Sequence, residues 1–194
     1  MKCLICENNN TNYLDDYRYN VKFDARYFED PKIFRCLECD ISFCNPMPSI
    51  SNLDRFYNNI YRAFGRPHEF DMIDIRNNYN NNKNISYLEY LEKFIKIDNI
   101  KQLFDFGSGT GCLGHLIKEK YKKLEINCAE KDIYCKEILQ EREYKNYKDI
   151  DKIKDKFDLI VSLHSLEHLT NLKIFEKFKE LSKKNSYIFI EVPN

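Results

Sequence analysis

"LFDFGSGTGCLGHL" (residues 103–116) sets the fold class, and it can be read in two frames. Counted from Gly109, its glycines have the G-x-G-x-x-G spacing of a dinucleotide-binding loop. Counted from Asp105, an acidic residue comes first and glycines follow at 107, 109 and 111. In both frames a short apolar strand leads into a glycine loop and then a helix, which is typical of the ligand-binding edge of a doubly wound α/β sheet.

Strand and helix patterns alternate from residue 86 onward. Ser86 and Glu89 have the spacing of a capping box, which predicts that a helix begins there. After it the pattern predicts strands at 102–106, 124–130, 157–163 and 187–192, a short strand at 144–147, and helices at 112–121, 132–143 and 165–183. This order predicts a Rossmann-like parallel sheet with helices on both faces.

Asp105 favours the second frame. A dinucleotide loop needs an apolar strand that runs into its first glycine, and its pyrophosphate binds at a helix N-terminus. A carboxylate inside the strand suits a ligand with an ammonium group, such as S-adenosylmethionine (SAM), which carries no phosphate. Glu130, at the end of the next strand, can hold a ribose in either frame. An NAD(P)-dependent enzyme is the alternative in the first frame.

Four segments resemble successive motifs of class I SAM-dependent methyltransferases: "FDFGSGTG" (104–111), "CAEKD" (128–132), "FDLIVSLHSLEHL" (157–169) and "YIFIEVPN" (187–194). The resemblance implies methyl transfer from SAM to a small-molecule acceptor. It also implies which residues contact each part of the cofactor. The methionine end contacts Asp105, Gly107, Ser108, Gly109, Thr110 and Gly111, and the ribose contacts Glu130. The adenine lies between Asp149 and Ile150, and the methyl group lies next to Leu163 and His164. His164 is also the candidate for catalysis, and no residue of the chain matches the histidine base of the family.

Four of the eight cysteines form two C-x-x-C pairs, Cys3 with Cys6 and Cys36 with Cys39. Two such pairs can close a tetrahedron of thiolates around Zn²⁺ and leave no open position, which predicts a structural site. The other interpretation is that these are unrelated buried cysteines. "CLIC" (3–6) and "FRCLECDISFCNPMPSISNLDRFYNNIY" (34–61) resemble the zinc-binding N-terminal module of bacterial methyltransferases that act on sugars, including nucleotide-sugar C-methyltransferases.

We therefore expect three parts: a zinc-ribbon-like module at residues 1–48, a helical and Asn-rich connector at 49–85, and a SAM-binding core at 86–194. By the resemblance, the acceptor is a nucleotide-linked or surface-polysaccharide sugar. Tyr57 and Tyr61 are candidates for the acceptor side, and packing of an amphipathic helix is their alternative role.

Composition argues against several partners. The 31 basic and 31 acidic residues cancel, so no basic field favours nucleic acid and no polybasic run favours a membrane surface. The N-terminal "MKCLICENNN" becomes polar too early for a signal peptide, and no apolar run reaches membrane-spanning length. We expect a cytoplasmic protein that binds neither nucleic acid nor membranes.

Residues 164–168, "HSLEH", match the H-x-x-E-H motif of inverted zinc proteases. That motif needs both histidines on one helical face, whereas His164 falls at a predicted strand end and His168 in the following helix. We therefore reject a protease, and we expect Glu167 and His168 to open that helix as structural residues.

The sheet that the chain resembles has seven strands, and the sequence ends directly after the fifth. We expect an incomplete methyltransferase core whose last strand (187–192) is an apolar edge, open to self-association or to a complementing C-terminal fragment. A catalytically incomplete zinc- and SAM-binding fragment that acts as a binding module is the further alternative.

Overall fold

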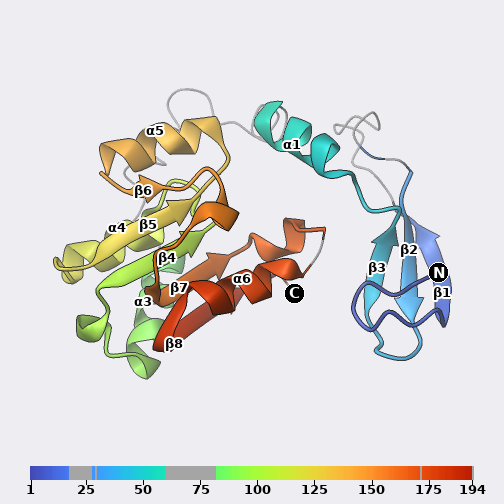
Figure 1. The fold of residues 1–194 in the computed structure, drawn as a ribbon, viewed down its shortest axis with the longest axis horizontal. Helices are drawn as coiled ribbons and strands as arrows, with labels where there is room; N and C mark the ends of the chain where they lie inside the picture. Colours follow the sequence, from blue (N-terminus) through green and yellow to red (C-terminus); the bar gives the residue numbers. More distant parts are fainter. Residues whose placement is uncertain (18–27, 29, 60–81, 171, 194) are drawn as a thin grey trace. The chain divides into compact units, whose positions relative to one another are not determined.

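The computed structural model describes residues 1–17, 28, 30–59, 82–170 and 172–193. The chain divides into two compact units, Met1–Gly65 and Arg66–Asn194 (Figure 1). The division falls inside the predicted connector at 49–85, and most of the Asn-rich part of that connector lies outside the described residues. None of the helices in these ranges combines the length and the apolar character that crossing a membrane requires.

The first unit contains a small antiparallel sheet and one helix. The strands β1 (Thr11–Asp16), β2 (Lys32–Cys36) and β3 (Ser42–Asn45) lie in that order, and α1 (Ile50–Asn59) follows in the chain. Among the described residues, the buried cluster of this sheet consists of Cys3, Cys36 and Phe43, with Phe34 packed against it. Such a small core contributes little hydrophobic stabilisation, so the sheet needs another source of stability.

The second unit is built on a parallel five-stranded sheet in the order β6-β5-β4-β7-β8 (Figure 1). Its strands are β4 (Gln102–Phe106), β5 (Glu125–Ala129), β6 (Lys145–Asn146), β7 (Phe157–Leu163) and β8 (Ser182–Glu191). Its helices are α3 (Asn82–Phe94), α4 (Cys112–Lys120), α5 (Ile133–Glu141) and α6 (Lys173–Leu181), with short 3-10 turns η3 (Ile97–Asn99), η4 (Ile150–Lys152) and η5 (Leu166–His168). The predicted Rossmann-like α/β sheet is confirmed. Its strand order reverses next to β4, which is where such sheets bind ligands.

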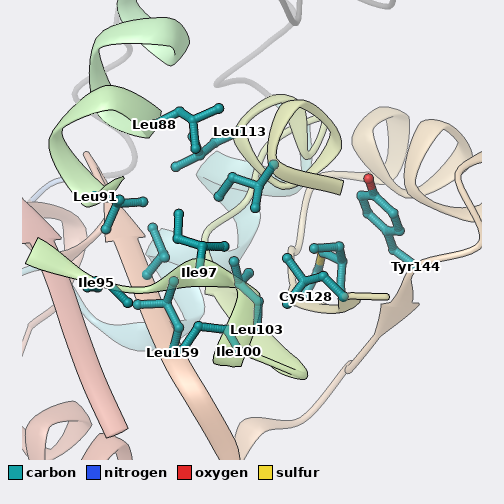
Figure 2. Packing of buried hydrophobic residues seen from close by; sticks show 14 of the residues in the cluster. Leu88, Leu91, Ile95, Ile97, Ile100, Leu103, Leu113, Cys128, Tyr144 and Leu159 are labelled. Carbon is teal, nitrogen blue, oxygen red and sulfur yellow. The ribbon is translucent and has the colours of Figure 1, made fainter. Parts of the chain in front are cut away.

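Two apolar clusters hold the helices to this sheet. Successive residues of β4 alternate between them, because Leu103 belongs to the first cluster and Phe104 to the second. In the first cluster Leu91 of α3 and Leu113 of α4 pack over the sheet (Figure 2). The second cluster includes Phe178 of α6. Because β4 is buried on both faces, a charged residue in it is costly unless a partner or ligand compensates its charge.

Three boundaries differ from the sequence-based prediction. Ser86 lies inside α3, so it does not cap the start of that helix. The helix predicted after β7 is two elements, η5 and α6, and the residues between them include Thr170, whose low helix propensity disfavours one continuous helix. Strand β8 begins at Ser182 rather than Tyr187, and its register with β7 is irregular before Tyr187.

Candidate cofactor site and cysteine cluster

The loop between β4 and α4 depends on its glycines. Gly107, Gly109 and Gly111 have φ values of 73°, 55° and 71°, in the left-handed region that glycine adopts without strain. Gly111 occupies the N-cap position of α4 in that conformation. At Gly107 space is restricted as well, because a Cβ there would collide with the hydroxyl group of Ser165. The loop can therefore keep its shape only with glycine at these positions.

We predict that Gly107→Ala destabilises the second unit by about 1–3 kcal/mol, because it adds both a strained φ and a steric collision. Gly114→Ala is the matched control. Gly114 lies inside α4 without a positive φ, and its added Cβ would meet Ile126 Cγ2 at 3.1 Å, so this substitution adds one tight side-chain contact and no backbone strain. The measurement is urea unfolding followed by circular dichroism. Equal midpoints for the two variants would contradict the prediction.

Asp105 lies in the buried part of β4 and is 5% exposed. Burial raises the pKa of its carboxyl group to about 7, and the nearby charge of Glu130 adds to this effect. The ionised carboxylate is therefore disfavoured in the protein by itself. A cationic ligand group placed against it would offset that penalty, which makes Asp105 a suitable partner for an ammonium group.

Glu130 follows β5 and holds the glycine loop. Its Oε2 accepts a hydrogen bond from the Gly109 N–H at 2.7 Å, and its Oε1 accepts one from the Asp132 N–H at 2.8 Å. The side-chain amide of Asn146 bonds both the N–H and the carbonyl group of Glu130, at 3.0 and 3.3 Å. The structure thus brings Asp105, the loop that contains Ser108 and Thr110, and Glu130 together at one edge of the sheet.

Asp149 and Ile150 come after β6, whose carboxyl end lies at the same edge. Asp149 caps η4 by accepting a hydrogen bond from the Asp151 N–H at 3.0 Å, and it pairs with Lys152 Nζ at 3.1 Å. The Lys152 ammonium group holds the pKa of Asp149 below its ordinary value. Ile150 packs at the border of the second apolar cluster. Their predicted contact with the adenine stays a prediction.

Leu163 ends β7, and His164 follows it with a φ of 51°. The His164 ring has partners that the sequence motifs did not indicate. Its Nε2 lies 2.5 Å from Lys83 Nζ, 3.0 Å from Glu191 Oε1 and 3.3 Å from Tyr87 Oη. Lys83 and Tyr87 are four residues apart on α3, so helical spacing alone would have placed them on one face, although nothing in the sequence pointed that face toward His164.

The H-x-x-E-H segment does not form a metal centre in the structure. Glu167 Oε1 lies 3.9 Å from both His164 Nδ1 and His168 Nε2, which is too long for hydrogen bonds. Glu167 and His168 lie in the turn η5 rather than at the start of a long helix. Within the described ranges, the one cluster of metal-ligating side chains is formed by cysteines.

The thiols of Cys3, Cys6, Cys36 and Cys39 lie within 4.8 Å of one another. The Sγ atoms of Cys3 and Cys39 are 3.6 Å apart, and those of Cys6 and Cys36 are 3.5 Å apart. A tetrahedron with Zn–S bonds of about 2.3 Å has edges of about 3.8 Å, so the cluster is close to the size that zinc requires. Burial opposes ionisation of both Cys3 and Cys6. N–H groups of Cys6 and Ile5 and neighbouring thiols nevertheless lower the pKa of Cys3 to about 6, whereas burial and the neighbouring thiols raise the pKa of Cys6 to about 12, so without a metal ion the negative charge resides on Cys3. Thiolate is the form that binds zinc.

Tyr57 and Tyr61 were the candidates for the acceptor side. Tyr57 lies on α1 in the first unit, half-buried, with its ring 5.4 Å from the ring of buried Phe56. This contact agrees with a packing role. Tyr61 lies outside the described residues.

Comparison with known proteins gives the family. A family model described as "Methyltransferase domain" matches residues 50–194. (S)-coclaurine N-methyltransferase from Thalictrum flavum subsp. glaucum is 25% identical over 118 residues, which cover 55% of this chain and 33% of the relative. The chain therefore spans about a third of the length of this curated relative.

Solved structures share the fold at low sequence identity. The plantazolicin methyltransferase BpumL, in complex with a pentazolic desmethylPZN analog and SAH, is 14% identical with a TM-score of 0.52, over 74% of this chain and 60% of that chain. DesVI from Streptomyces venezuelae has the same identity and TM-score, over 66% of this chain and 58% of that chain. Since the family model covers most of the sequence, including the glycine loop and every strand of the parallel sheet, the chain belongs to the methyltransferase domain family.

Proposed function

We propose that this protein binds SAM at the carboxyl edge of the parallel sheet and transfers the methyl group to a small-molecule acceptor. The observation that carries the proposal is the buried Asp105 carboxylate next to a glycine loop that Glu130 holds in place. A buried acid without a ligand is a cost to the fold, and an ammonium group is the kind of ligand that removes this cost.

Each residue then has a role set by its chemistry. Asp105 accepts hydrogen bonds from the amino group, and the loop lets the backbone approach the methionine end closely. Glu130 is fixed by Gly109 and Asp132 and still has lone pairs for the ribose hydroxyl groups. Asp149 and Ile150 flank the adenine. The sulfonium supplies an already activated methyl group, so the protein mainly has to align it with the acceptor.

We predict that the protein binds S-adenosylhomocysteine (SAH) with micromolar affinity and does not bind NADH. The Asp105 carboxylate in β4 repels a pyrophosphate and attracts an ammonium group, whereas Glu130, after β5, can hold a ribose of either ligand. Separate calorimetric titrations with SAH and NADH measure the difference. Glu130→Ala is expected to weaken SAH binding by about tenfold or more through the lost ribose contact. Binding of NADH in preference to SAH would establish the dinucleotide frame instead.

The acceptor class that we propose is a nucleotide-linked or surface-polysaccharide sugar, and it rests on the resemblance of residues 3–6 and 34–61 to the module of sugar methyltransferases. Tyr57 and Tyr61 are our candidates for its binding. Incubation of the protein with methyl-labelled SAM and separate pools of nucleotide-linked sugars, amines and phenols tests the class. Label transfer confined to amines or phenols would reject a sugar acceptor.

We propose further that Cys3, Cys6, Cys36 and Cys39 hold one structural zinc ion. Four thiolates complete a tetrahedral shell, so the ion has no open position for a substrate. Cys6 and Cys39 are exposed, which argues against the interpretation as unrelated buried cysteines. Cysteines that bind zinc instead of forming disulfides fit the reducing cytoplasm, where we place the protein.

A further inference from the structure

His164 is fixed beside the proposed cofactor loop by its backbone. The left-handed φ of 51° is costly for a residue with a side chain and persists only where the surroundings impose it. Its N–H group donates to the Glu191 carbonyl at 3.0 Å. The hydroxyl group of the next residue, Ser165, lies 3.2 Å from the carbonyl oxygens of both Gly107 and Leu163, and its one hydrogen is shared between them. These bonds tie the end of β7 to β8 on one side and to the glycine loop on the other.

Two oppositely charged groups compete for His164 Nε2. Glu191 Oε1 lies 3.0 Å away and can only accept, so a hydrogen bond to it needs a proton on Nε2. Lys83 Nζ lies 2.5 Å away and, as an ammonium group, can only donate, so it needs the lone pair of Nε2. In the plane of the neutral ring, a nitrogen carries either a proton or a lone pair, never both. The two contacts therefore require opposite tautomers of the neutral ring.

Three observations favour the carboxylate. Glu191 pairs with Leu163 in the β7–β8 register, so its backbone is fixed next to His164. The Tyr87 hydroxyl oxygen, 3.3 Å from Nε2, can accept the same Nε2 proton, and burial and the Glu191 carboxylate hold the pKa of Tyr87 above its ordinary value. Lys83 is exposed and has another partner, since its ammonium group lies 5.5 Å from the centre of the Tyr87 ring.

We infer that Glu191 is a positioning residue that accepts the Nε2 proton of His164 and leaves Nδ1 as the basic atom of the ring. The inference rests on the proposed methyl transfer, in which a hydroxyl or acidic C–H acceptor must lose a proton. The acceptor loses that proton to Nδ1 as its heavy atom bonds the methyl carbon and the carbon–sulfur electron pair passes to sulfur. The resulting imidazolium has Glu191 at Nε2 and Glu167 Oε1 at 3.9 Å from Nδ1, and both carboxylates stabilise the cation against the charge of Lys83.

The tautomer of His164 tests the inference without knowledge of the acceptor. Long-range proton–nitrogen NMR of the full chain, labelled with nitrogen-15 histidine, measures the ratio of the Nε2–H to the Nδ1–H form at alkaline pH, with His164→Gln for assignment. We expect Nε2–H to predominate. Glu191→Ala should lower the ratio about tenfold, whereas Glu191→Gln, which keeps an acceptor oxygen, should retain most of it. Lys83→Ala should leave the ratio at or above its wild-type value.

Predominance of the Nδ1–H form, or a ratio that responds to Lys83→Ala and not to Glu191→Ala, would overturn the inference. The signals of His115, on α4, serve as the internal control for an intact fold in each variant. Calorimetry with SAH on the same samples separates the two claims. Absence of SAH binding refutes the proposed function, whereas SAH binding with a ratio insensitive to Glu191 refutes the positioning role alone.

Discussion

Chelation of the metal that we propose at Cys3, Cys6, Cys36 and Cys39 is expected to unfold β1, β2 and β3 while the parallel sheet of the second unit stays folded. The described core of the small sheet has Phe43 as its only large buried side chain, worth about 2–3 kcal/mol. Structural zinc contributes about 10 kcal/mol or more. Hydrogen exchange resolved by segment, before and after chelation, is the measurement, and elemental analysis should find one zinc per chain.

Cys39→Ser separates the metal from packing. Cys39 is exposed, and a serine at an exposed position without a special role changes stability by about 0.5 kcal/mol or less. As a zinc ligand, however, its loss should raise exchange throughout β1–β3 and abolish tight zinc binding. Cys44→Ser, on β3 but outside the cluster, is the matched control and should keep both. If Cys39→Ser and Cys44→Ser behave alike, the zinc site does not exist.

Much of the parallel sheet could be predicted because its strands are apolar on both faces. Leu103 and Phe104 show why this works: one residue packs on each side of the sheet, so the run "QLFDF" is buried on both faces, and the glycine loop directly after it marks the end of the strand. The position of Glu130 followed from the same logic, since the carboxyl ends of neighbouring parallel strands meet at one edge.

The environment of His164 could not be predicted in the same way. Its partners Lys83, Tyr87 and Glu191 come from α3 and β8, and the side chains meet only because tertiary packing brings the first turns of α3 to the ends of β7 and β8. Local sequence carries no information on such a meeting. The Ser86 capping box failed for a related reason, because capping patterns also occur by chance inside a longer helix whose ends other contacts set.

Neutralising Asp105 is expected to stabilise the ligand-free protein at alkaline pH. The folded pKa of about 7 lies above the ordinary 3.8, so the native state holds this proton more tightly than the unfolded chain. The stabilisation is fully present below the unfolded pKa and is lost as pH rises through about 7, which amounts to about 4 kcal/mol. Asp105→Asn should remove this dependence and unfold at higher urea concentration than wild type at pH values above the folded pKa.

The same substitution should weaken SAH binding. An acid whose neutralisation raises the stability of the ligand-free protein and lowers its affinity for the ligand is identified as a ligand-binding residue. The neutral amide of the Asp105→Asn variant cannot offer a carboxylate to the ammonium group, so affinity should fall about 10- to 100-fold at alkaline pH. Wild-type affinity should also fall as pH drops below about 7, because binding must then expel the Asp105 proton, whereas the variant should lack this dependence.

Asp158→Asn is the control. Burial opposes the charge of Asp158, but Lys183 and two backbone N–H groups hold its pKa low, so its neutralisation should destabilise the sheet. A variant Asp105→Asn that is less stable than wild type at alkaline pH, or binds SAH as well, would show that Asp105 is an ordinary structural acid.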